Sequence, residues 1–111
     1  MDVSVRNEIY ELHARLCKAL ADPKRLLIIN ALRDGQKSVG ELTAELELSQ
    51  SNVSQHLAVL RERGVVAATR DGNNVFYTLK DVRVVEALDL LRSVMASQLD
   101  RRSELRPIAT G

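Results

Sequence analysis

Apolar residues recur at steps of three and four positions along most of this chain, which is the spacing of one face of an α-helix. The pattern predicts one helix over residues 3–20, another over residues 82–99, and three shorter helices between them. Before the last helix, short runs rich in Val, Phe and Tyr predict two strands instead. The chain is therefore predicted to be mainly α with a small β-hairpin.

Polar residues mark where the inner helices begin and end. Asp22 and Pro23 suit the N-cap and the first position of the second helix, which stops at Asp34 and Gly35. Ser38, with Glu41 three residues later, fits a capping box and begins the third helix. A tight turn at residues 46–48 separates the third helix from the fourth, which Ser49 caps and which ends at Gly64.

The two strands cover residues 65–68 and 75–79, and Gly72 and Asn73 can adopt the positive φ that a tight hairpin turn needs. Helix, turn, polar-faced helix and hairpin is the order of a winged helix-turn-helix, here α-α-α-α-β-β-α. Such a fold offers DNA two contact points, one in a groove and one on the backbone.

The fourth helix carries the clearest candidate chemistry. Residues 49–55 contain no charge and three serines, whereas a merely solvated helix face favours Lys and Glu, which are better helix formers. Amides can pair with adenine in the major groove, and hydroxyls at a helix start can hold bases or phosphates. The predicted DNA contacts of this helix are Ser49, Gln50, Ser51, Asn52, Ser54, Gln55 and His56.

Three further residues extend the predicted DNA-binding surface. Arg61, like Arg63, lies in or near the presumed DNA face, and Arg70 is placed to reach a minor groove or a phosphate from the wing. Asn73 lies at the tip of the wing, where ordinary turn chemistry explains it equally well.

Length and composition set the broader class. The 111 residues suit one domain over residues 1–100 with a flexible tail at 101–111, and a helical chain of this size often gains stability by dimerising. The apolar stripes of the first and last helices are wide enough for such an interface. The predicted interface residues are Val5, Ile9, Leu12, Leu16, Val84, Leu88, Leu91 and Met95.

The net charge of +1 supports a nucleic-acid partner only weakly, so a protein-interaction module without DNA binding is the alternative. No stretch has transmembrane length, no secretory signal precedes the first helix, and a single cysteine forms no internal disulfide. These features predict a cytoplasmic protein with no membrane partner. The sequence shows no motif of an enzyme, a cofactor site or a metal cluster.

His13 and Cys17 lie four residues apart on one face of the first helix, where an imidazole and a thiol could ligate a soft metal. Two ligands are too few for a complete site, and cysteine is commonly a small buried apolar residue. A sensor role for this pair and a structural role for Cys17 both stay open.

Several stretches resemble the ArsR/SmtB family of bacterial winged helix-turn-helix repressors. They are residues 20–26 (LADPKRL), 39–42 (VGEL), 48–57 (LSQSNVSQHL), 60–61 (LR), 64–66 (GVV) and 72–79 (GNNVFYTL). The resemblance spans about residues 12–95 and implies a homodimer built on the first and last helices. It also implies repression from an inverted repeat in double-stranded DNA, with an inducer that lowers the DNA affinity.

The family's known sensor residues do not carry over to this chain. Ser38 and Gly40 stand where the sensors of arsenic and heavy metals have a Cys-x-Cys pair. Asp81 matches the zinc sensors, but Arg83, Val94 and Ser97 replace their other ligands, and the single cysteine excludes the family's two-cysteine switch. The sequence thus leaves the inducer unknown.

Overall fold

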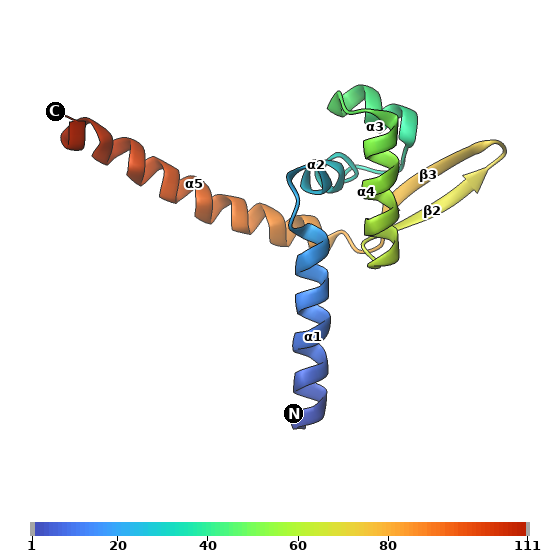
Figure 1. Cartoon of the computed structure of the whole chain (residues 1–111), viewed down its shortest axis with the longest axis horizontal. Coiled ribbons are helices and arrows are strands. Elements are labelled where there is room, and N and C mark those ends of the chain that lie inside the picture. The colour runs from blue at the N-terminus through green and yellow to red at the C-terminus, as the bar shows by residue number, and fades with distance from the viewer. Residues whose placement is uncertain (1, 111) are drawn as a thin grey trace. The chain divides into compact units, whose positions relative to one another are not determined.

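The structure is a computed structural model that describes residues 2–110, with side chains described for residues 2–101. The chain divides into a first unit that ends at Asp81 and a second that begins at Val82. The elements are α1 (Val3–Leu20), α2 (Pro23–Ala31), β1 (Lys37–Ser38), α3 (Val39–Leu46), α4 (Gln50–Glu62), β2 (Val66–Asp71), β3 (Asn74–Leu79) and α5 (Arg83–Thr110), and all but β1 are labelled in Figure 1.

Side-chain caps begin the inner helices where the sequence predicts them. At α2, Oδ1 of Asp22 accepts hydrogen bonds from the backbone amides of Lys24 (2.8 Å) and Arg25 (3.2 Å). At α3, the Ser38 hydroxyl accepts from the amide of Glu41, whose carboxylate accepts from the amide of Ser38, each at 3.1 Å. The predicted N-cap and capping box are both confirmed.

The end of α4 has the geometry of a Schellman motif. Gly64 has a φ of +77°, its amide donates to the carbonyl of Arg61 (3.1 Å), and the Val65 amide donates to the carbonyl of Leu60 (2.9 Å). A glycine takes this left-handed conformation without the steric cost of a side chain. The buried Leu60 and Val65 then bring the chain from the helix directly into β2.

The core of the first unit forms where α2, α3 and α4 pack on one another and α4 packs on β2. The predicted stripe of α4 is confirmed, because Val53, Leu57 and Leu60 have no exposed surface. Leu42 of α3 is equally buried, and the turn between α3 and α4 passes through Glu47 with a φ of +55°. The apolar side of α4 is thus fixed, which leaves its polar side turned outward.

The sheet has three strands in the order β1-β3-β2, all antiparallel, whereas the sequence predicts only the two strands of a hairpin. In the added strand, Lys37 pairs with Tyr77 and Ser38 pairs with Phe76 of β3. A strand of two polar residues has no alternating pattern of its own, because its pairing comes from the neighbouring strand. The β2–β3 hairpin extends beyond the helices of this unit as the wing (Figure 1).

The tip of the wing is a two-residue turn between Asp71 and Asn74, which face each other in the ladder. Gly72 has a φ of +65°, but Asn73 does not share the positive φ. Glycine with positive φ at the first central position alone is the pattern of a type II′ turn. Of the two candidate residues, only Gly72 uses the left-handed region.

The second unit consists of α5, in which Val85 and Leu88 are buried. Its backbone is helical as far as Thr110, beyond the end predicted at residue 99. The flexible tail predicted at residues 101–111 stays a prediction, because the side chains of residues 102–111 lie outside the described ones. No helix in the described part of the chain is long and apolar enough to cross a membrane.

Candidate DNA-binding surface

The candidate DNA-binding surface begins at the first turn of α4. Ser49 caps this helix as predicted, since its hydroxyl accepts a hydrogen bond of 3.1 Å from the amide of Asn52. The Ser49 oxygen is therefore engaged within the chain, and its hydroxyl hydrogen is the group left to donate to another molecule. Gln50 and Ser51 follow in the first turn, and both are exposed.

Over residues 50–55, the exposed side of α4 carries hydroxyl and amide groups with no charge among them. Ser51, Ser54 and Gln55 are exposed, and Asn52 is half-buried. Val53 and Leu57 hold the opposite side in the core, so these polar groups cannot rotate inward without breaking that packing. Such a rigid set of neutral donors and acceptors suits the edges of base pairs in the major groove.

The wing supplies a second exposed region in the same unit. Arg70 pairs with Val75 in the ladder and its side chain is exposed, as is Asn73 at the tip. Arg61 is exposed too, but it lies ten residues after Ser51, which is about 15 Å further along the helix axis. Arg61 therefore belongs to the far end of α4 rather than to its polar start.

His56 is the predicted contact whose surroundings differ most from expectation. Its side chain is only 18% exposed, and Nε2 lies 4.0 Å from Oδ1 of Asp22. Its other nitrogen, Nδ1, lies 3.4 Å from Nη1 of Arg25. The ring is turned toward the start of α2, and neither Asp22 nor Arg25 is among the site residues predicted from the sequence. Both residues belong to the stretch at residues 20–26 that resembles the family, and this resemblance is the signal by which the sequence could have indicated them.

The charges around Asp22 change its acidity. Desolvation raises the pKa of this carboxyl, but the hydrogen bonds from the amides of Arg25 and Lys24 and the electrostatic interactions with the nearby His56 and Arg25 side chains lower it more. The net result is a pKa below the usual value for aspartate. Asp22 is thus held in its charged form beside the ring of His56.

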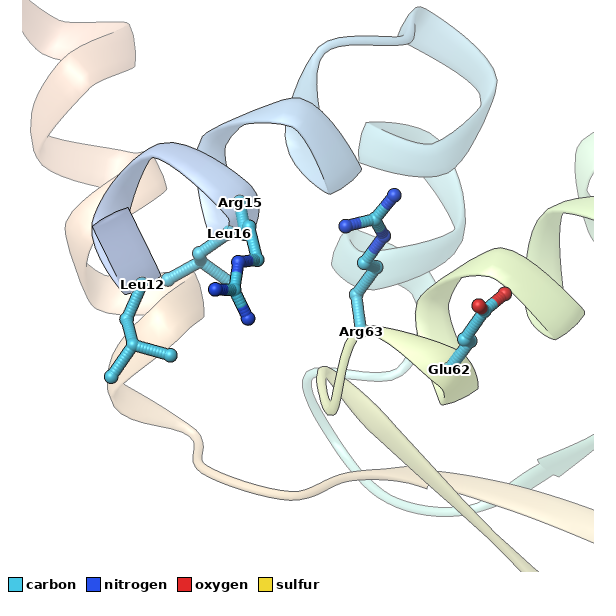
Figure 2. Close-up of a pocket in the computed structure, with 5 residues that line it drawn as sticks. All are labelled: Leu12, Arg15, Leu16, Glu62 and Arg63. Carbon is cyan, nitrogen blue, oxygen red and sulfur yellow. The ribbon is translucent and has the colours of Figure 1, made fainter. Parts of the chain in front are cut away.

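A cavity of about 280 Å³ lies between α1 and the end of α4. In Figure 2, Leu12, Arg15 and Leu16 of α1 line one side, and Glu62 and Arg63 line the other. Arg63, which the sequence places with Arg61 and Arg70 in or near the presumed DNA face, therefore lines a cavity beside α1.

The predicted dimer-interface residues differ in how much surface they leave open. On α1, Val5, Ile9 and Leu12 are exposed and Leu16 is half-buried. On α5, Leu91 and Met95 are exposed, whereas Val84 is half-buried and Leu88 is buried at 8% exposure. Isolated apolar helix faces of this extent normally mark an interaction surface. On α5, the exposed residues of the predicted interface are therefore those that follow Leu88.

His13 and Cys17 are both exposed on α1. Among the described residues, no group of three or more His, Cys, Asp or Glu side chains is arranged to hold a metal ion. A sensor role for His13 and Cys17 stays a prediction.

Comparison with known proteins places this geometry in a family. The family model described as "Bacterial regulatory protein, arsR family" matches residues 22–68. An uncharacterized HTH-type transcriptional regulator of Mycobacterium tuberculosis, Rv0081, is 42% identical over 105 residues, which cover 93% of this chain and 92% of the relative. The transcriptional activator HlyU of Vibrio cholerae is 49% identical over 76 residues (68% and 70%), and the biofilm growth-associated repressor of Agrobacterium fabrum is 46% identical over 78 residues (68% and 67%).

Solved structures agree with the sequence comparison. The crystal structure of M. tuberculosis Rv0081 matches with a TM-score of 0.74 and 43% identity, over 85% of this chain and 95% of that one. The solution structure of the homodimeric winged helix-turn-helix DNA-binding domain of Mb0332 from Mycobacterium bovis matches with a TM-score of 0.78 and 25% identity, over 90% and 93%. These relatives are transcriptional regulators rather than enzymes. The chain belongs to the ArsR family of bacterial winged helix-turn-helix transcriptional regulators.

Proposed function

We propose that this regulator is a cytoplasmic homodimeric repressor that binds an inverted repeat in double-stranded DNA and is released by an effector. The observation that carries the proposal is the uncharged exposed side of α4 over residues 50–55, held in orientation by the buried side of the same helix. We assign base or phosphate contacts to the exposed residues of this side and of the wing, namely Ser49, Gln50, Ser51, Ser54, Gln55, Arg70 and Asn73.

Each α4 offers one short contact surface, so two copies are needed to read a longer sequence. A two-fold symmetric dimer presents two identical helices to DNA, and the matching DNA sequence is then an inverted repeat. The open apolar faces of α1 and α5 support this assembly.

Selection of bound sequences from genomic DNA at near-physiological salt tests the proposal directly. Recovery of one inverted repeat is the expected result. No enrichment of any motif would refute DNA recognition and favour a protein-interaction role for the same fold. A reporter gene placed behind the selected sequence then gives the sign of regulation, since expression should rise when the regulator is deleted.

Gln55→Ala tests the assignment of base contacts. If the Gln55 amide makes a paired base contact, its loss costs about 1–3 kcal/mol, or about 5- to 150-fold in affinity for the selected sequence. Fluorescence anisotropy with selected and scrambled duplexes measures this change. Gln36→Ala is the matched control, because Gln36 is exposed and lies outside α4, the wing and the predicted dimer interface. Equal affinity of Gln55→Ala and wild type for the selected duplex would refute the assignment.

A further inference from the structure

Arg25 of α2 reaches back to the end of α1. Its Nε donates a hydrogen bond of 2.6 Å to the carbonyl of Ala19, and its Nη2 donates one of 3.2 Å to the carbonyl of Lys18. Carbonyls in the last turn of a helix lack the usual amide partner four residues later, and the partial negative charge there favours a cation. The Lys18 carbonyl also accepts a hydrogen bond of 3.3 Å from the amide of Ala21. The guanidinium thus fixes the last turn of α1 to the first turn of α2.

The same guanidinium extends to α4 through its third nitrogen. Nη1 of Arg25 lies 3.4 Å from Nδ1 of His56, and since arginine can only donate, Nδ1 must be the acceptor and carry no proton. The neutral ring then carries its proton on Nε2, which lies 4.0 Å from Oδ1 of Asp22. Both ring nitrogens therefore face groups of α2, with the guanidinium at one and the carboxylate at the other.

His56 directly follows Gln55 on α4, so the direction of its ring is tied to the rotation of the helix about its axis. A rotation that turned the exposed residues differently toward DNA would pull the ring away from Arg25 or push it against Asp22. The contacts of Asp22, Arg25 and His56 therefore connect the last turn of α1, the predicted dimerisation helix, with the orientation of α4.

We propose that Asp22, Arg25 and His56 are positioning residues, which refine the orientation that the buried side gives to α4 and thereby its affinity for specific DNA, without touching the DNA. This inference rests on the proposed function, since it concerns the orientation of the proposed DNA-binding surface on α4. It gives His56 an intramolecular role in place of the base contact predicted from the sequence. A guanidinium fork is needed at position 25, because the single ammonium group of lysine cannot hold two carbonyls and a ring nitrogen in fixed directions.

Two substitutions of His56 separate this role from direct DNA contact. The side-chain oxygen of asparagine comes near the place of Nδ1 and can accept from Arg25, whereas the longer amide of glutamine reaches the place of Nε2 instead. His56→Asn should therefore keep the contact with Arg25, and His56→Gln should lose it. Both residues are neutral amides, so they serve as matched variants of each other.

The experiment measures the affinity of wild type, His56→Asn, His56→Gln and Arg25→Lys for the selected duplex and for scrambled DNA over a range of salt concentrations. We expect His56→Gln and Arg25→Lys to bind the selected duplex about tenfold more weakly, a typical coupling between sites, with His56→Asn close to wild type. Affinity for scrambled DNA and the salt dependence should not change, because no phosphate contact is removed. Unfolding in urea and sedimentation equilibrium check that each variant is folded and dimeric.

Two results would overturn the inference. Equal weakening by His56→Asn and His56→Gln, with a smaller salt dependence, would make His56 a direct DNA contact. Wild-type affinity in both His56→Gln and Arg25→Lys would show that the contacts do not orient α4. If His56→Gln fails to fold, the comparison of Arg25→Lys with wild type decides. Failure of wild type itself to bind any selected duplex would instead refute the proposed function.

Discussion

Substitution of Ile9 by serine should weaken dimerisation by an amount that follows from its exposure. Ile9 is 46% exposed, so about half of its side chain remains to be covered by a partner. Complete burial of such a side chain contributes about 1.5–3 kcal/mol, and covering the exposed half contributes about 1 kcal/mol in each subunit. A two-fold interface contains the residue twice, so Ile9→Ser should raise the dimer Kd about 30-fold, equivalent to about 2 kcal/mol.

Sedimentation equilibrium over a range of protein concentrations measures this Kd. Glu11→Ser is the matched control, because Glu11 is also exposed on α1 but lies two residues on, about 200° around the helix from Ile9. The reasoning would be refuted by a dimer Kd for Ile9→Ser within about threefold of wild type, or by an equal shift for Glu11→Ser. Leu12, which is 53% exposed on the same stripe, allows an independent repeat as Leu12→Ser.

Two further predictions concern stability. Leu57 has no exposed surface, so Leu57→Ala should lower the free energy of unfolding by about 2–5 kcal/mol, whereas Leu57→Met should lower it by less than about 1.5 kcal/mol. Urea denaturation measures both values, and equal losses would show a core that is not tightly packed. The pKa of Asp22 is lowered by folding, so the stability that its charge contributes is present above the unfolded-state pKa of about 3.9 and is lost as the pH falls through the folded-state value. The difference in unfolding free energy between wild type and Asp22→Asn should therefore be largest at neutral pH and should diminish as the pH falls below the unfolded-state value; a difference independent of pH would contradict this reasoning.

The local chemistry of the helix ends made most of the fold predictable. Asp22, Ser38 and Ser49 cap their helices as expected, and Gly64 ends α4, because each of these residues satisfies backbone groups only a few positions away. The strand at Lys37 and Ser38 was not predictable in this way. It exists because β3, almost forty residues later, offers it a free edge, and no local pattern records that pairing.

For the candidate site too, the part set by local sequence was predictable and the part set by packing between distant elements was not. The uncharged run on α4 identifies its exposed side, because burial of Val53 and Leu57 fixes which residues face outward. The environment of His56 depends on Arg25, 31 residues earlier in the chain, and on Asp22 beside it. The sequence predicts a polar histidine on a polar helix face, and only the packing of α2 against α4 shows that this ring is turned inward.

Ser38 belongs to two elements at once, since its backbone pairs with Phe76 of the wing sheet and its side chain caps α3. The helix α3 packs in turn on α4, so Ser38 and α3 connect the wing sheet to α4. Within one subunit, this connection holds the two surfaces proposed to contact DNA, the polar start of α4 and the wing, at one spacing. In the proposed dimer, an effector would then change DNA binding through the separation of the two subunits, which must match the number of base pairs between the two half-sites.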